Sequence, residues 1–173
     1  MDNNIQNSSL LDLTGLLRGE VRELDFDMTL SPELDVEAIA IDAPPRIKGK
    51  AVNLSGYITF DAELTVKYTT HCSRCLKEVS TTMKQKIFSP IAEKLENMDN
   101  EEYIIPEQNG KINLDDIARE AFFLNLPMTH LCKTDCKGLC AKCGKDKNEG
   151  DCGCVIKEKD PRWKALEGFF DED

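Results

Sequence analysis

The chain has 173 residues, with 22 Lys and Arg against 32 Asp and Glu, a formal net charge of −10 and eight cysteines. This length supports one domain, or one domain with a small appendage, and 40% apolar residues suffice for a buried core. No apolar run approaches the roughly 20 residues that span a bilayer, and residues 1–9 lack the features of a secretory signal. We therefore expect a cytoplasmic protein with reduced thiols, in which eight cysteines indicate metal or redox chemistry.

The acidic total argues against a protein that binds nucleic acid mainly by neutralising phosphates, because such proteins usually present a basic face. The charge is nevertheless segregated along the chain. Residues 64–88 have five basic side chains and one acid, whereas residues 89–107 have six acids and one lysine. The basic stretch is small, and a solvated strand face is its plainer interpretation.

In chain order, residues 1–35 mix short apolar clusters with glycine and proline, so we expect short elements that pack on a larger core. From Val36 the pattern is strand-like as far as the Pro-Pro pair at 44–45, which must interrupt a ladder or lie at its edge. Strand-like alternation follows within residues 51–68. Residues 79–88 provide an antiparallel partner for that strand.

After an acidic loop at residues 93–110, a helix is expected over residues 113–126, because Asn113 can cap it and Pro127 ends it. The predicted class is α+β: an antiparallel β-sheet with a packing helix and a C-terminal cysteine-rich, zinc-stapled segment. We divide the chain into three parts. These are N-terminal elements (1–35), a sheet-and-helix core (36–128), and a cysteine-rich zinc-binding tail (129–173) with a short helix at 161–169, whose Trp163 and Leu166 dock on the core.

Six of the eight cysteines lie in the last 45 residues, where few aliphatic side chains are available for a core. Metal is the obvious means of ordering such a segment. A short Cys-x2-Cys turn lets two thiolates reach one zinc ion, and Gly144 after the second cysteine permits the positive φ that helps such a turn. The strongest chemical signal is a zinc site at Cys140, Cys143, Cys152 and Cys154.

The other four cysteines predict a second site, made of Cys72, Cys75, Cys132 and Cys136. The first two fall in the turn between two predicted strands, so a shared ion would tie that hairpin to the segment after the helix. Ligands could exchange between the two clusters, and His71 and His130 stand beside cysteines as substitute ligands. We expect one zinc ion and allow for two.

Three other chemistries fit parts of the pattern. Residues 136–143 have the spacing of a radical-SAM iron–sulfur motif, but only about 30 residues follow, too few for the barrel of such enzymes. Cys72 and Cys75 could be a thioredoxin-like redox pair, although strands flank them on both sides. Disulfides would require an oxidising compartment. Four thiolates leave zinc no open position for water, and no catalytic motif is present, so we expect no enzyme.

A series of motifs follows in a fixed order: Cys72-Ser-Arg-Cys75, Lys111-Ile-Asn-Leu-Asp115, Leu126-Pro127, Cys136-Lys-Gly-Leu-Cys140-Ala-Lys-Cys143-Gly, Cys152-Gly-Cys154 and Asp160-Pro-Arg-Trp-Lys-Ala-Leu166. Their order and spacing resemble the bacterial YceD family, also called large ribosomal RNA subunit accumulation proteins, over roughly residues 36–166. The resemblance implies a role in accumulation or maturation of 23S ribosomal RNA and in large-subunit biogenesis. Genes of the family often neighbour one for a zinc-ribbon large-subunit ribosomal protein.

Two functions compatible with this resemblance differ in their partner, and neither requires a membrane or a small-molecule substrate. The first is a non-catalytic factor that binds precursor 23S rRNA or a ribosomal protein. The second is an acidic adaptor that shields a basic large-subunit ribosomal protein, a task that suits a net charge of −10. A thiol redox or metal-responsive regulator built on Cys72 and Cys75 is a third hypothesis. The candidate RNA contacts are Arg74, Lys77, Lys84 and Lys86, which Lys133, Lys137 and Lys142 could adjoin.

Overall fold

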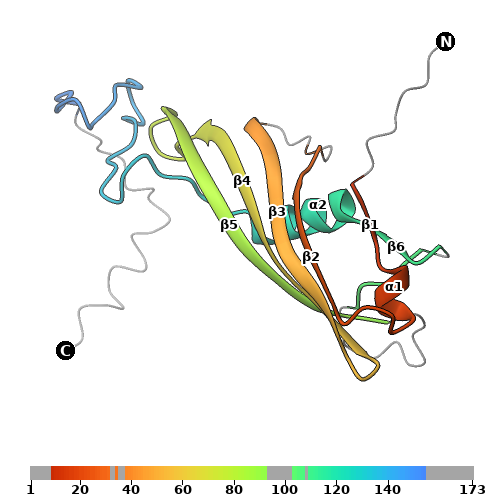
Figure 1. The fold of residues 1–173 in the computed structure, drawn as a ribbon. Coiled ribbons are helices and arrows are strands. Elements are labelled where there is room, and N and C mark those ends of the chain that lie inside the picture. The colour runs from red at the N-terminus through yellow and green to blue at the C-terminus, as the bar shows by residue number, and fades with distance from the viewer. Residues whose placement is uncertain (1–8, 32–33, 35–37, 93–102, 108, 155–173) are drawn as a thin grey trace, which may run out of the picture.

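Four strands and one long helix dominate the residues that the structure, a computed structural model, describes: 9–31, 34, 38–92, 103–107 and 109–154. The main antiparallel sheet has the order β2-β3-β4-β5, and α2 lies against one of its faces (Figure 1). A short sheet pairs β1 with β6 beside α1. The bounds are β1 Leu10–Asp12, α1 Thr14–Leu17, β2 Glu23–Thr29, β3 Ala40–Leu54, β4 Tyr57–His71, β5 Glu78–Ile91, β6 Lys111–Asn113 and α2 Leu114–Asn125. The sheet and its packing helix confirm the α+β prediction.

The core lies between the sheet and α2. Alternation along β4 turns one side of the strand inward, so that Phe60 and Leu64 are fully buried and Tyr68 is almost so. Tyr68 meets Phe122 of α2 edge to face, with 5.6 Å between the ring centroids. Phe26 of β2 stacks on Phe60 with a centroid distance of 5.2 Å. No helix among the described residues is both long and apolar enough to cross a membrane.

A two-residue turn at Ser55 and Gly56 joins β3 to β4, because Leu54 pairs directly with Tyr57. Both turn residues have positive φ, 56° and 98°, as a tight hairpin that follows the strand twist requires. The side chain of Asn53 accepts a hydrogen bond from the Gly56 N–H at 2.8 Å. The turn therefore divides residues 51–68, which the sequence presents as one strand-like stretch, between two strands.

The sheet extends further than the sequence indicates in two places. β2 lies within residues 1–35 and pairs with β3 over seven residues, so the sheet begins before Val36. β3 also continues through Pro44 and Pro45, where its register with β4 shifts. Such an irregularity accommodates residues without an N–H, and Leu30 N–H still donates to the Pro45 carbonyl at 2.7 Å.

Helix α2 begins and ends where its sequence signals predict. Asn113 is the N-cap, and its side chain accepts a hydrogen bond from the Asp115 N–H at 3.0 Å. The Asp115 carboxylate in turn accepts from the Ser9 and Ser31 N–H groups at 3.3 and 3.1 Å, which fastens the N-terminal residues to the start of α2. The predicted helix at 161–169, with Trp163 and Leu166, lies outside the described residues, as do 93–102 and 108 of the acidic loop.

Candidate metal centres

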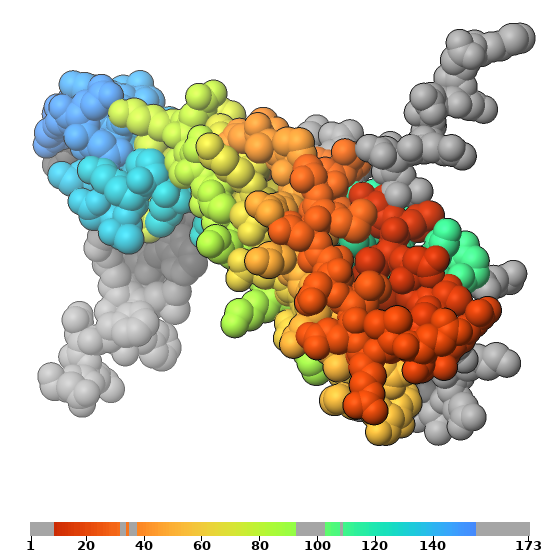
Figure 2. Space-filling view, viewed as in Figure 1, coloured from red at the N-terminus to blue at the C-terminus, as the bar shows by residue number. Residues whose placement is uncertain are grey.

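The eight cysteines gather in two groups of four. In each group the four Sγ atoms lie within 4.8 Å of one another. The first group is Cys72, Cys75, Cys132 and Cys136, and the second group is Cys140, Cys143, Cys152 and Cys154. Figure 2 shows the cysteine-rich residues as a lobe at one end of the molecule. The grouping is the one that the spacing of the cysteines predicts.

Sulfur separations in the first group fit a tetrahedral metal site. Cys72 Sγ lies 3.8 Å from Cys136 Sγ, and Cys75 Sγ lies 3.6 Å from Cys132 Sγ. Four thiolates about 2.3 Å from a zinc ion stand roughly 3.8 Å apart, whereas a disulfide requires about 2.05 Å. All eight cysteines are free. A set of four soft sulfur donors suits zinc or an iron–sulfur centre.

The two Cys-x2-Cys turns have the same backbone pattern. In the first, the Leu76 N–H donates to the Cys72 carbonyl at 2.9 Å, and the Cys72 N–H donates to the Lys77 carbonyl at 2.8 Å. In the second, Gly144 and Cys140 make the equivalent bond at 2.8 Å, and the Cys140 N–H donates to the Lys145 carbonyl, also at 2.8 Å. The residue after the second cysteine has positive φ in both turns, 62° at Leu76 and 73° at Gly144.

Leu76 occupies a backbone conformation that costs an L-residue about 1–2 kcal/mol. Its side chain is 62% exposed, so little packing is lost when it is removed. We expect Leu76→Gly to stabilise the metal-loaded protein by about 1 kcal/mol, and Gly144→Leu to destabilise the second turn by a similar amount. Thermal unfolding and competition with a metal chelator measure both. Opposite signs support the shared geometry, and a loss of stability in Leu76→Gly contradicts it.

The first group joins the β4–β5 hairpin to the chain that follows α2. Ser73 N–H donates to the His130 carbonyl at 2.8 Å, and His130 N–H donates to Ser73 Oγ at 3.1 Å. Gly138 has φ 70°, and a Cβ there would lie 2.9 Å from the Arg74 carbonyl oxygen. That close approach lets the Leu139 N–H donate to the same carbonyl at 3.0 Å.

Residues 146–149 fasten the second group onto the first. Asn148 Nδ2 lies 3.4 Å from Cys136 Sγ, and Asn148 Oδ1 accepts from the Lys137 N–H at 3.0 Å. Lys77 Nζ pairs with Asp146 at 2.9 Å and with Glu149 at 3.0 Å. The hydrogen bond from Lys77 and, to a smaller extent, the hydrogen bond from the Asn148 N–H lower the pKa of Asp146 to about 2. The two groups of cysteines therefore belong to one connected lobe.

Within each group the pKa values of the thiols are shifted in opposite directions. Burial raises the pKa of Cys72, but nearby backbone N–H groups outweigh burial and lower it to about 6. Burial and the neighbouring thiols raise the pKa of Cys132 to about 12. In the second group, backbone N–H groups lower the pKa of Cys140 to about 6, and neighbouring thiols raise that of Cys154 to about 12. Lowered pKa values favour the thiolate at Cys72 and Cys136 in the first group and at Cys140 in the second. Four adjacent thiolates, however, require a cation.

The two histidines are not part of either group. His130 Nε2 lies 2.9 Å from the hydroxyl of the buried Tyr68, and the two rings meet edge to face. His71 is exposed at the end of β4, opposite Glu78. Histidine substitution for a cysteine ligand is therefore unnecessary, and His130 instead links the first group to the core.

All four candidate RNA contacts are exposed, and two of them have partners within the lobe. Arg74 Nη1 donates to the Cys136 carbonyl at 2.8 Å, so this side chain helps to hold the lobe together, as Lys77 does through its ion pairs. Lys133, Lys137 and Lys142 lie exposed in the lobe. The sequence alone does not indicate that Arg74 and Lys77 stabilise the lobe, because the residues they bond to lie more than 60 positions away in the chain.

Lys84 and Lys86 lie on the exposed face of β5, and in the row of residues through Lys86 the charges alternate in sign across the four strands. Strand pairing places Lys86 opposite Glu63, Glu63 opposite Lys48, and Lys48 opposite Asp27. Paired residues on one sheet face are close enough for opposite charges to attract. The sheet face around these lysines is thus mixed in charge rather than basic.

The fold is an antiparallel sheet with a packed helix. Its eight cysteines form two groups of four, so the chain belongs to a class of proteins with two candidate sites for structural metal. The family model described as "Large ribosomal RNA subunit accumulation protein YceD" matches residues 60–170, which include most of β4, all of β5 and α2, and all eight cysteines. The chain therefore belongs to the YceD family, as its motifs predict.

Two curated relatives resemble the chain in part. "Large ribosomal RNA subunit accumulation protein YCED homolog 1, chloroplastic" of Arabidopsis thaliana is 34% identical over 61 residues, which is 35% of this chain and 19% of that protein. "Uncharacterized protein ML1660" of Mycobacterium leprae is 25% identical over 143 residues, 78% of this chain and 65% of that protein. The chain thus matches about a fifth of the first relative and just under two thirds of the second. No solved structure matches.

Proposed function

We propose that the chain is a non-catalytic factor that promotes accumulation and maturation of 23S ribosomal RNA in the cytoplasm, and thereby biogenesis of the large ribosomal subunit. The family match over residues 60–170 carries this proposal, because it includes the sheet edge, α2 and both groups of cysteines. The Arabidopsis relative bears the name of a large ribosomal RNA subunit accumulation protein, which supports the same role here.

Zinc has a structural role in this proposal. Each group of cysteines holds one ion, and four thiolates leave that ion no position for a reacting water. The lobe between residues 130 and 154 has few aliphatic side chains, so metal is what gives it a fixed shape. An ordered lobe beside the β4–β5 hairpin then presents a surface to the ribosomal partner, and no chemical step by this chain is required.

Charge supports a second candidate for the direct partner. Lys86 faces Glu63, Arg74 and Lys77 are engaged within the lobe, and the chain has a net charge of −10. These features favour contact with a basic large-subunit ribosomal protein over contact with RNA phosphates. In that case the chain acts as an acidic adaptor, and 23S RNA accumulates because the ribosomal protein is delivered.

We expect expression of this chain, in a bacterium that lacks its own family member, to restore the ratio of 23S to 16S rRNA. Rescue depends on the first group of cysteines, so Cys72→Ser should not restore the ratio. Quantification of both rRNAs and of free subunits on sucrose gradients measures the effect. If the wild-type chain accumulates as folded protein and the ratio stays low, the proposed function is wrong.

The paired variant Lys84→Glu/Lys86→Glu distinguishes the two partners. Direct RNA binding predicts that it weakens binding to 23S fragments by roughly tenfold or more, with a shallower salt dependence. The control, Lys48→Glu/Lys50→Glu, makes the same change in net charge on the same sheet face, and RNA binding should tolerate it. Equal RNA binding by both variants, with tight binding to a basic ribosomal protein, favours the adaptor.

A further inference from the structure

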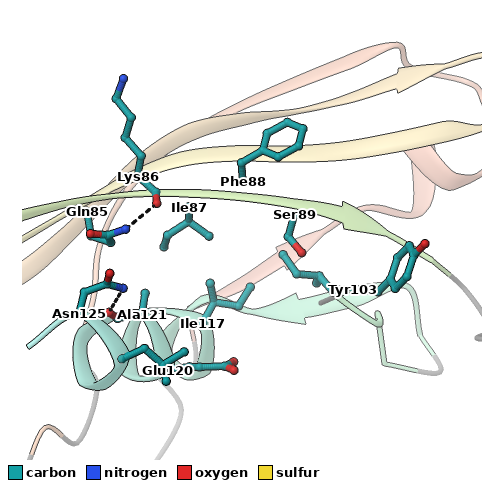
Figure 3. A pocket seen from close by; sticks show the side chains of 12 residues that line it. Gln85, Lys86, Ile87, Phe88, Ser89, Tyr103, Ile117, Glu120, Ala121 and Asn125 are labelled. Atoms are coloured by element: carbon teal, nitrogen blue, oxygen red, sulfur yellow. Dashed lines mark hydrogen bonds between the residues drawn. The ribbon is translucent and has the colours of Figure 1, made fainter. Parts of the chain in front are cut away.

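A groove of about 420 Å³ lies between β5 and α2, on the side of the sheet that faces the helix. In Figure 3 the side chains of Ile87 and Ser89 point toward α2, whereas Lys86 and Phe88 point to the other face of the sheet. Ile117 and Ala121 approach from the helix. The groove therefore has an apolar floor.

Leu124 is the most exposed apolar residue of this groove on α2, with 70% of its surface accessible. Within the described part of the chain, no element covers it. Gln85 and Asn125 lie at the same end of the groove, and Glu120 lies on its rim. An exposed leucine beside half-buried isoleucines is typical of a surface that another apolar segment covers.

We propose that residues 160–170 of this chain dock in the groove as a helix, with Trp163 against Leu124. The sequence Asp160-Pro161 is a favourable helix start, with aspartate as the N-cap and proline at the first helical position. Trp163, Leu166 and Phe170 then follow at intervals of three and four residues, which places them on one side of a helix. Such a stripe is stable in water only when an apolar surface covers it.

The length of chain beyond Cys154 suffices for this docking. The second group of cysteines adjoins the start of β5, because Lys77 pairs with Asp146 and Glu149. Gln85 stands eight residues further along the strand, roughly 26 Å at 3.3 Å per residue. The six residues from Cys154 to Asp160 extend to roughly 20 Å, and the three helical residues to Trp163 add about 5 Å. This reach of roughly 25 Å, to which the Trp163 side chain adds its own length, brings Trp163 to the near end of the groove, and the residues after it continue along the groove.

Charge and the extent of the family match agree with this occupant. Residues 160–170 are neutral overall, with Asp160 and Glu167 balancing Arg162 and Lys164. Glu120 on the rim has no ion-pair partner among the described residues, so either basic side chain beside Trp163 can pair with it. The family model matches residues 60–170, a range that contains both walls of the groove and the whole docking segment. A contact within this one chain requires no second molecule.

Trp163 is the single tryptophan of the chain, so intrinsic fluorescence of the full-length, metal-loaded protein reports the docking directly. We expect a blue-shifted emission and protection from acrylamide quenching. Leu124→Glu should move the emission to that of free tryptophan and abolish the protection. The control is Leu54→Glu, the same substitution at a residue that is 63% exposed at the turn between β3 and β4, and it should change neither.

Three outcomes overturn the proposal. Emission of free tryptophan in the wild-type chain would mean that the segment does not dock, and the groove would then be available to a separate partner. Blue-shifted emission that Leu124→Glu leaves unchanged would place Trp163 elsewhere. Protection that disappears on dilution, together with a dimer in light scattering, would assign the groove to the tail of a second copy.

Discussion

Protein purified without oxygen and without added metal is expected to contain two zinc ions per chain, one for each group of four cysteines. The sulfur separations of 3.6 and 3.8 Å in the first group fit a tetrahedral ion. Structural zinc contributes on the order of 10 kcal/mol or more to small metal-ordered folds, so its loss should have the largest effect of any change considered. Elemental analysis measures the stoichiometry.

Single cysteine variants should separate the two ions. Cys75→Ser and Cys152→Ser are each expected to lower the zinc content to about one per chain. Their effects on stability should differ, because the first group joins segments about 60 residues apart, whereas the ligands of the second all lie within residues 140–154. Cys75→Ser should therefore lower the melting temperature of the sheet, and Cys152→Ser should mainly loosen the lobe.

One zinc ion in the wild-type chain would contradict the two-site assignment and leave one group of thiols for other chemistry. Iron together with inorganic sulfide would contradict structural zinc and favour electron transfer. Circular dichroism during chelation provides the complementary test, since the sheet core between β4 and α2 contains no cysteine and should retain strand signal. A chain that loses all structure on chelation would show that the core depends on metal.

Local sequence patterns were sufficient to predict the second group of cysteines and the limits of α2, and the first group followed as the four cysteines that remained. Cys140 and Cys143 are near neighbours with glycine behind them, and Asn113 and Pro127 act within one helical turn of the helix ends. Such signals involve residues a few positions apart, whose relative geometry the backbone largely determines. The same holds for alternation along β4, which identifies its buried face without knowledge of its partners.

Long-range contacts were not predictable in this way. β2 is a short strand whose assignment depends on pairing with β3, and nothing within Glu23–Thr29 specifies that partner. Arg74 and Lys77 resemble free basic residues in the sequence, yet they bond to Cys136 and to Asp146 in the folded lobe. The positive φ of Leu76 is also unexpected, because glycine is the usual residue there. The pairing of β2, the partners of Arg74 and Lys77 and the conformation of Leu76 all depend on contacts with residues that are distant in the sequence or on the folded turn.

Gly49→Ala is expected to destabilise the protein by about 3 kcal/mol, at the upper end of the usual cost of overpacking. Gly49 pairs with Ala62 across β3 and β4 and with Phe26 of β2, in the middle of the sheet. A Cβ at Gly49 would lie 2.2 Å from the Asp61 carbonyl oxygen and 2.6 Å from the Ala62 Cα. These are backbone atoms, so relief requires the two strands to separate rather than a side chain to rotate.

Chemical denaturation of the metal-loaded variant measures this effect, and Gly15→Ala is the matched control. Gly15 lies in α1, and a Cβ there would meet only the Val21 Cγ2 atom at 3.4 Å and the Glu20 carboxylate at 4.0 Å. Alanine is a better helix former than glycine by about 1 kcal/mol, so Gly15→Ala should leave stability unchanged or raise it slightly. Equal stability of the two variants would contradict the close contact of β3 and β4 at Gly49.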